Sequence, residues 1–202
     1  MKKLILVIGL LVLATSAYAG SVGMTFVGFS PGGWESGYAY YATVNGGPVI
    51  DVMCDDWAHG GLPGQKWPAY YTNLGTGRLK LLRFNTLTDA GTLYDEAGWL
   101  LLQTEVAPKS EWQSINYAVW NIFDSSAPLL YNAPYWLTQA QKEASLGFPG
   151  VDFSQVGIYT PTNQYDTNPS GSQELLTLSP EPGTLLLLAS GLAGLLTRKR
   201  LW

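Results

Sequence analysis

Cys54 carries the most reactive side chain in this sequence, because a thiolate is both a nucleophile and a metal ligand. It is the only cysteine, so no intrachain disulfide can form. Asp55 and Asp56 follow it directly, and the only histidine, His59, lies nearby. Structural zinc is usually held by four ligands, mostly Cys and His, and this stretch alone does not provide them. We therefore expect no metal site.

Carboxylates are the other groups that could do chemistry. Asp55, Asp56 and Glu35 would be the candidates for the acid and base of a hydrolase, but the sequence shows no paired arrangement for them. It also shows no phosphate-binding glycine loop and no Ser/His/Asp signature. We expect a protein without catalytic residues and without a cofactor.

The elements that position Cys54 are predicted to be strands. Residues 22–29, 38–44 and 49–54 are strand-like, and "NGGP" between the last two is a turn signal, so Cys54 falls at the end of a strand. The next stretch, "DDWAHGGLPGQKWP", is rich in Gly and Pro and predicts a loop. Its aromatic residues Trp57 and Trp67 are candidates for stacking on sugar rings, although aromatic residues more often belong to a core.

Two amphipathic helices are predicted after this loop. Residues 92–105 place Leu93, Ala97, Leu100 and Leu101 on one face, with Thr92 as a cap. Residues 110–124 begin with a predicted capping box of Ser110 and Gln113. The apolar stripe of this second helix consists of Trp112, Ile115, Val119, Ile122 and Phe123.

Asn116 lies within that stripe. A buried amide needs a hydrogen-bond partner, because leaving it unpaired costs about 1–3 kcal/mol. A weaker helix is expected at residues 138–146, and residues 155–161 and 173–178 are expected to be closing strands. The order predicts an α+β fold: a β-rich, sandwich-like or barrel-like extracellular domain with a helical insertion.

Three segments in this region resemble bacterial thioester domains. They are "VMCDDW", "YDEAGWLLLQ" and "INYAVWNIFD", which together cover residues 52–124. The resemblance implies a Cys that attacks a Gln side-chain amide, releases ammonia and forms an internal thioester able to capture an amine or a hydroxyl. The Cys matches Cys54, but the position of the Gln is occupied by Asn116. Asn is one methylene shorter than Gln, and Gln113 is the nearest substitute.

The first 19 residues predict a cleaved signal peptide. Lys2 and Lys3 precede an apolar run at residues 4–13, and the small residues Ala17 and Ala19 predict cleavage between Ala19 and Gly20. The apolar run is too short to span a bilayer. The chain is therefore expected to pass through the secretion machinery and to meet signal peptidase.

The last 24 residues, 179–202, predict a second signal. Pro180, Glu181 and Pro182 precede an uncharged run at residues 183–197, which is expected to form a short transmembrane helix. Arg198, Lys199 and Arg200 follow and would keep the tail in the cytoplasm. The segment resembles the PEP-CTERM sorting domain. The resemblance implies processing by exosortase in a Gram-negative envelope. It also implies anchoring in the inner membrane before processing, and later the cell surface or extracellular matrix.

The body, residues 20–178, is long enough for one domain with its own core. All 15 acidic residues lie between Glu35 and Glu181, whereas five of the 11 basic residues belong to the two terminal signals, which leaves the exported region at a net charge of −9. This charge argues against binding to nucleic acid, which requires a basic surface.

The sequence thus predicts an exported surface or exopolysaccharide-matrix protein that is sorted by exosortase. Two alternatives remain open at this point. One is a covalent adhesin that uses Cys54 with Asn116 or Gln113, and the other is a carbohydrate-binding module that uses Trp57 and Trp67.

Overall fold

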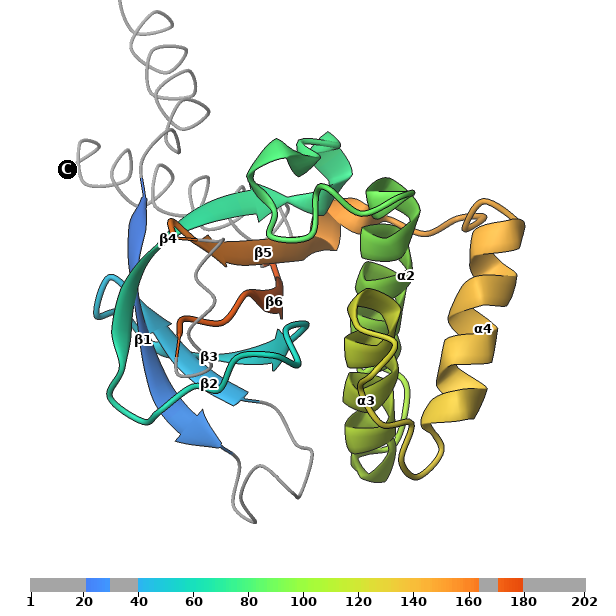
Figure 1. Ribbon diagram of the computed structural model, residues 1–202, viewed down its shortest axis with the longest axis horizontal. Helices are drawn as coiled ribbons and strands as arrows, with labels where there is room; N and C mark the ends of the chain where they lie inside the picture. The colour runs from blue at the N-terminus through green and yellow to red at the C-terminus, as the bar shows by residue number, and fades with distance from the viewer. Residues whose placement is uncertain (1–20, 30–39, 164–170, 180–202) are drawn as a thin grey trace, which may run out of the picture.

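A closed antiparallel barrel of six strands makes up one half of the computed structural model, and three helices lie beside it (Figure 1). The structure describes residues 21–29, 40–163 and 171–179. Around the barrel the order is β1-β2-β3-β6-β5-β4, with every neighbouring pair antiparallel. The strands are β1 (Val22–Phe29), β2 (Tyr40–Val44), β3 (Val49–Cys54), β4 (Lys66–Asn73), β5 (Val156–Pro161) and β6 (Leu175–Leu178).

The three helices all belong to the connection between β4 and β5, so the predicted α+β order with a helical insertion is confirmed. They are α2 (Ala90–Gln103), α3 (Trp112–Phe123) and α4 (Ala133–Ser145). Figure 1 shows α2 and α3 facing the barrel, with α4 on their far side. Among the described residues, no helix has the length and apolar character needed to cross a bilayer.

One strand was not predicted. Strand β4 begins at Lys66, inside the stretch expected to be a loop, and closes the barrel between β1 and β5. Its alternation is short: Trp67 and Ala69 are buried, whereas Lys66 and Pro68 are exposed. The nearby Gly and Pro residues obscured this period-two pattern.

The predicted helix starts were wrong in detail. Helix α2 begins at Ala90, with Asp89 rather than Thr92 at the N-cap position. Ser110 lies in a short 3₁₀ helix, Lys109–Glu111, in which the N–H of Glu111 donates to the carbonyl of Pro108. That turn moves the start of α3 to Trp112, so the N-cap residue is Glu111 rather than Ser110, and the side chain of Glu111 makes no capping hydrogen bond. The third helix begins at Ala133 rather than at residue 138, with a proline in its first turn.

The core is continuous between the barrel and the helices. Met24, Phe26 and Trp67 fill the barrel, while Ile115 and Val119 of α3 are fully buried on the side that faces it. The predicted stripe of α3 is largely correct, although Trp112 and Ile122 are only half-buried. At the other end of the chain, Ser179 directly follows β6. Its N–H donates to the carbonyl of Gln155 at 2.6 Å, and its hydroxyl accepts from Tyr71 at 3.2 Å.

The signal peptide (1–19), Gly20, Glu35 and the C-terminal segment (180–202) lie outside the described residues. The structure therefore does not test the predictions for the sorting motif, the transmembrane helix and the basic tail.

Gly75 offers a test of the close approach between the two ends of the connection from β4 to β5. A Cβ at this position would lie 2.8 Å from the backbone nitrogen of Ser154 and 2.9 Å from its Cα. We expect Gly75→Ala to lower the free energy of unfolding by about 1–3 kcal/mol, because backbone atoms cannot move aside cheaply. Urea denaturation measures this change.

The matched control is Gly91→Ala in the first turn of α2, where the nearest atom is the flexible Cδ1 of Leu79 at 3.3 Å. Because Ala favours helix over Gly by about 0.5–1 kcal/mol, this variant should lose no stability. Equal effects of the two substitutions would contradict the close approach of Gly75 to Ser154.

Candidate functional site

Cys54 is completely buried at the end of β3, next to Leu175 of β6 in the barrel register. Its Sγ lies 3.3 Å from both the carbonyl oxygen and the backbone nitrogen of Asp56. The thiol donates to the carbonyl and accepts from the N–H, so the turn that follows β3 closes around the sulfur.

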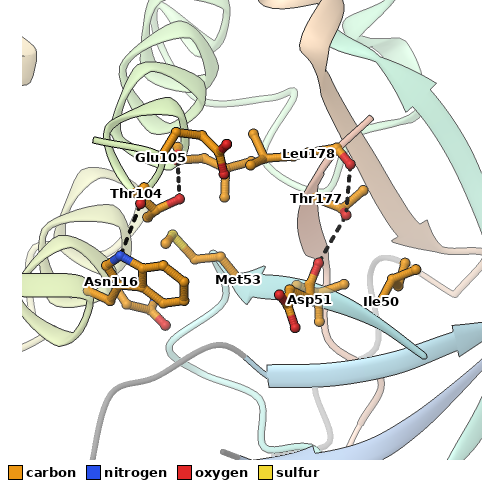
Figure 2. Close-up of a pocket in the computed structure, with 11 residues that line it drawn as sticks. Ile50, Asp51, Met53, Thr104, Glu105, Asn116, Thr177 and Leu178 are labelled. Carbon is orange, nitrogen blue, oxygen red and sulfur yellow. Dashed lines mark hydrogen bonds between the residues drawn. The ribbon is translucent and has the colours of Figure 1, made fainter. Parts of the chain in front are cut away.

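Asn116 is the residue that the helices bring to Cys54. It is 5 % exposed, and its Nδ2 donates a hydrogen bond of 2.7 Å to the carbonyl oxygen of Cys54. The amide therefore binds the backbone of the strand. Gln113, the other predicted candidate, lies half-buried in the first turn of α3. Figure 2 shows Asn116 and Met53 on the wall of a pocket of about 270 Å³ between the barrel and the helices.

The surroundings of Cys54 keep its thiol protonated. Burial raises the pKa of this thiol well above its ordinary value, and the neighbouring carboxylates of Asp56 and Asp55 raise it further. The backbone hydrogen bond from Asp56 acts in the opposite direction, as does the nearby indole of Trp120, although Trp120 Nε1 finds no partner at hydrogen-bonding distance. A protonated thiol is a poor nucleophile.

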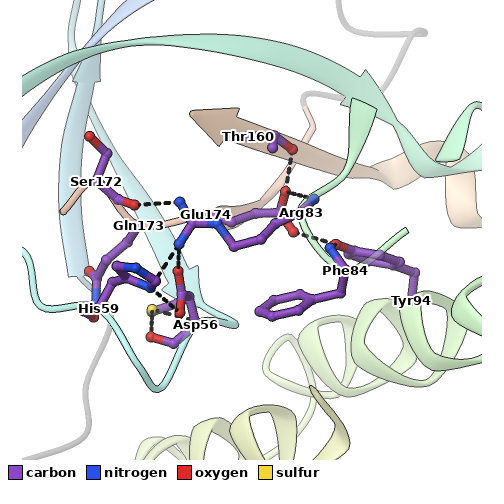
Figure 3. Close-up of polar contacts among 10 residues, drawn as sticks. Asp56, His59, Arg83, Phe84, Tyr94, Thr160, Ser172, Gln173 and Glu174 are labelled. Carbon is purple, nitrogen blue, oxygen red and sulfur yellow. Dashed lines mark hydrogen bonds and ion pairs between the residues drawn. The ribbon is translucent and has the colours of Figure 1, made fainter. Parts of the chain in front are cut away.

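A buried polar cluster lies beside Cys54, and Glu174 is at its centre (Figure 3). The Glu174 carboxylate accepts hydrogen bonds from the backbone N–H of Arg83 at 2.9 Å, the hydroxyl of Tyr94 at 2.5 Å and the hydroxyl of Thr160. These partners come from the connection after β4, from α2 and from β5. We call this group, together with Asp55, Asp56 and His59, the Glu174 cluster.

The guanidinium of Arg83 forms the second part of the cluster. It pairs with the carboxylate of Asp56 through Nη1 and donates through Nη2 to the carbonyl of Ser172 at 2.7 Å. Nδ1 of His59 lies 2.8 Å from Asp56 Oδ1 and 2.8 Å from Arg83 Nη1. Asp56 and His59 are thus engaged in an ion-pair network that fixes the loop after β3.

Asp55 has a different role, because neither of its carboxylate oxygens accepts a hydrogen bond from the residues that the structure describes. Burial raises the pKa of Asp55 well above its ordinary value, and the adjacent Glu174 raises it further by charge and by hydrogen bonding. Two buried carboxylates side by side do not both ionise. Of these two neighbouring groups, Asp55 is therefore the one whose protonated form the folded protein favours, and burial raises the pKa of Glu174 as well.

The other candidates from the sequence are placed as follows. The described residues contain no group of three or more His, Cys, Asp or Glu side chains that could hold a metal ion. Trp67 is 5 % exposed within the barrel, so the suggestion that it stacks on sugar is wrong. Trp57 is half-buried, with its ring 5.0 Å from that of Trp120.

Sequence reasoning missed Glu174, Arg83, Tyr94 and Thr160. The one available signal was Glu174 itself, a charged residue immediately before the apolar strand "LLTL". A carboxylate next to a buried strand implies partners, but the sequence does not say which ones.

Comparison with solved structures identifies the class of fold. The chain is similar to the N-terminal domain of the Streptococcus pyogenes pilus tip adhesin Cpa, with a TM-score of 0.50 and 12% identity, covering 83% of this chain and 97% of that domain. It is also similar to the N-terminal thioester domain of a Clostridium perfringens surface protein, with a TM-score of 0.47 and 13% identity, over 79% and 98% of the two chains. The thioester domain of the Streptococcus pyogenes fibronectin-binding protein SfbI gives a TM-score of 0.47 and 10% identity, over 82% and 96%.

The body thus has a fold shared with a bacterial surface adhesin domain, and it structurally resembles bacterial thioester domains. Residues 180–200 match the PEP-CTERM protein-sorting motif, so the predicted sorting signal is confirmed. The sequence matches no curated protein. The chain therefore carries a PEP-CTERM motif, which implies export and processing by exosortase, after a body that shares its fold with the N-terminal domain of Cpa.

The raised pKa of Asp55 predicts a pH dependence of stability. A carboxyl with a raised folded-state pKa contributes stability that is complete below its unfolded pKa of about 4 and is lost as the pH rises through the folded-state value. The Asp55→Asn variant keeps a hydrogen-bond donor at this position but removes the titratable carboxyl group. Its free energy of unfolding relative to the wild type should therefore increase from about pH 4 upward.

Urea unfolding at several pH values measures this difference. Asp51→Asn, which removes an exposed carboxylate from strand β3 shortly before Asp55, is the matched control and should follow the wild type. A constant difference between Asp55→Asn and the wild type across the pH range would show that Asp55 is ionised in the folded protein.

Proposed function

We propose that the mature protein is a surface or exopolysaccharide-matrix component that acts through non-covalent contacts and has no catalytic activity of its own. The PEP-CTERM motif supports its sorting by exosortase, and the adhesin-like fold supports a role in attachment. Under this proposal the protein is inserted transiently in the inner membrane, is cut near Pro180-Glu181-Pro182 and then reaches the cell surface.

The observation that carries the non-covalent part is the hydrogen bond from Asn116 to Cys54. A thioester would need the side-chain carbonyl carbon bonded to Sγ, with the amide nitrogen lost as ammonia. In this structure that nitrogen donates to the carbonyl of Cys54 at 2.7 Å, and Sγ is held by the backbone of Asp56. Both groups that would react therefore already have structural partners, and burial keeps the thiol protonated.

The intact mass of the protein recovered from the cell envelope and the medium tests the sorting. We expect an N-terminus at Gly20 and a C-terminus near Pro182. The double substitution of Pro180 and Pro182 by Ala should leave a chain that keeps Leu201 and Trp202 and stays in the membrane. Pro63→Ala, in an exposed loop, is the control and should be processed normally. A wild-type protein that retains Trp202 would contradict processing.

The same spectra test the chemistry of Cys54. We expect the full mass without loss of ammonia, a thiol that resists alkylation in the native state, and one alkyl adduct after denaturation. The covalent adhesin predicts instead a species lighter by one ammonia, which disappears in Cys54→Ala. Loss of that species in Asn116→Ala or in Gln113→Ala would then identify the amide used. Such a result would overturn the non-covalent proposal and leave the sorting proposal intact.

A further inference from the structure

The pocket beside Asn116 has walls from four elements. Strands β3 and β6 form one side, and the end of α2 and the start of α3 form the other (Figure 2). Its volume of about 270 Å³ is slightly below the range of about 300–1,000 Å³ that is usual for small-molecule sites. Such a volume suits one ring rather than a chain of rings.

The pocket is walled by rigid apolar surface. Trp112 contributes its indole, and Nε1 of that ring donates to the carbonyl of Thr104 at 3.1 Å. The ammonium of Lys109 lies 5.6 Å from the centroid of the same ring and restrains it further. Ile50 and Leu178 add aliphatic wall. A ring that is fixed before a ligand arrives loses little conformational entropy on binding.

The polar atoms of the pocket walls are mostly acceptors. The hydroxyl of Thr104 donates to the carbonyl of Leu101 at 2.6 Å, and that of Thr177 donates to the carbonyl of Asp51 at 3.0 Å. Since each hydroxyl proton is already used, both oxygens offer only lone pairs to a ligand. The carboxylates of Asp51 and Glu105 are acceptors as well.

The charge of the pocket is negative. Figure 2 shows Asp51 and Glu105 on opposite sides of it, and both residues are exposed. Within the described part of the chain, neither forms an ion pair, and none of the residues that line the pocket is basic. Carboxylates accept well from vicinal hydroxyls and from ammonium groups, and they repel anions.

We propose that this pocket binds a single sugar ring that carries no negative charge. A pyranose has the required combination of several hydroxyl donors and apolar C–H faces, which match the acceptor oxygens and the Trp112 wall. A uronic acid or a phosphorylated sugar is rejected by Asp51 and Glu105. This inference deepens the proposed function, because it names the class of ligand through which the body contacts a matrix.

Isothermal titration of the mature protein with four probes tests the proposal: methyl glucoside, methyl glucosaminide, methyl glucuronide and n-butylamine. We expect the neutral and the amino sugar to bind, and the glucuronide to bind at least about tenfold more weakly because of charge repulsion. Butylamine offers one donor group, so it should bind more weakly than the glucosaminide.

Variants locate the binding. Trp112→Ala should abolish sugar binding, and Glu105→Gln, which preserves shape and is exposed, should reduce the discrimination against the glucuronide. Tyr135→Ala removes a ring that is 52% exposed on α4, away from the pocket, and should leave all affinities unchanged.

The proposal is overturned if no sugar binds, if the glucuronide binds as well as the glucoside, or if butylamine alone binds. It is also overturned if sugar binds but Trp112→Ala and Glu105→Gln have no effect, because the sugar would then occupy another place. None of these outcomes changes the intact mass or the state of the Cys54 thiol, so a failure here is distinguishable from a failure of the proposed function.

Discussion

The carboxyl group of Glu174 is the point at which the barrel and the helices are joined. It receives donors from the connection after β4, from α2 and from β5, and it lies beside Asp55, the residue that directly follows β3. Burying a carboxyl group is costly unless every lone pair is used. The cluster therefore stabilises the arrangement only when all of these elements are in place, which couples the formation of the barrel to the docking of the helices.

Asn116 adds a second connection between the same two halves, from α3 to the backbone of β3. The geometry gives Asn116 a structural role at this position. The amide contributes to stability through the carbonyl of Cys54, whereas a reaction with Sγ would require it to leave that partner. The pocket next to it lies at the same interface between barrel and helices, and none of the residues that line it belongs to the Glu174 cluster.

Local patterns in the sequence predicted most of the elements, because apolar periodicity depends on neighbours along the chain. The strands at residues 22–29 and 49–54 and the inward face of α3 follow from such patterns. The position of Asn116 within the stripe of α3 also predicted a buried amide that needed a partner. Strand β4 was missed because Gly and Pro surround a short alternation. The Glu174 cluster was missed because its hydrogen bonds join distant parts of the chain, such as Arg83 and Glu174, which are 91 positions apart, and no local pattern encodes such contacts. The start of α3 was misplaced because a 3₁₀ turn precedes the helix.

The contacts of Ser179 determine how rigidly the body would be held at its C-terminal end. This residue is bonded to Gln155 and Tyr71 of the folded body, and it immediately precedes the PEP motif. A cut near Pro182 would leave only a few residues between the barrel wall and the new C-terminus. A group attached at that C-terminus would have little freedom to move relative to the barrel, unlike a domain on a long flexible linker. The body would then keep a fixed orientation relative to its point of attachment. Exosortase would have to cleave a site that lies only a few residues from a folded domain.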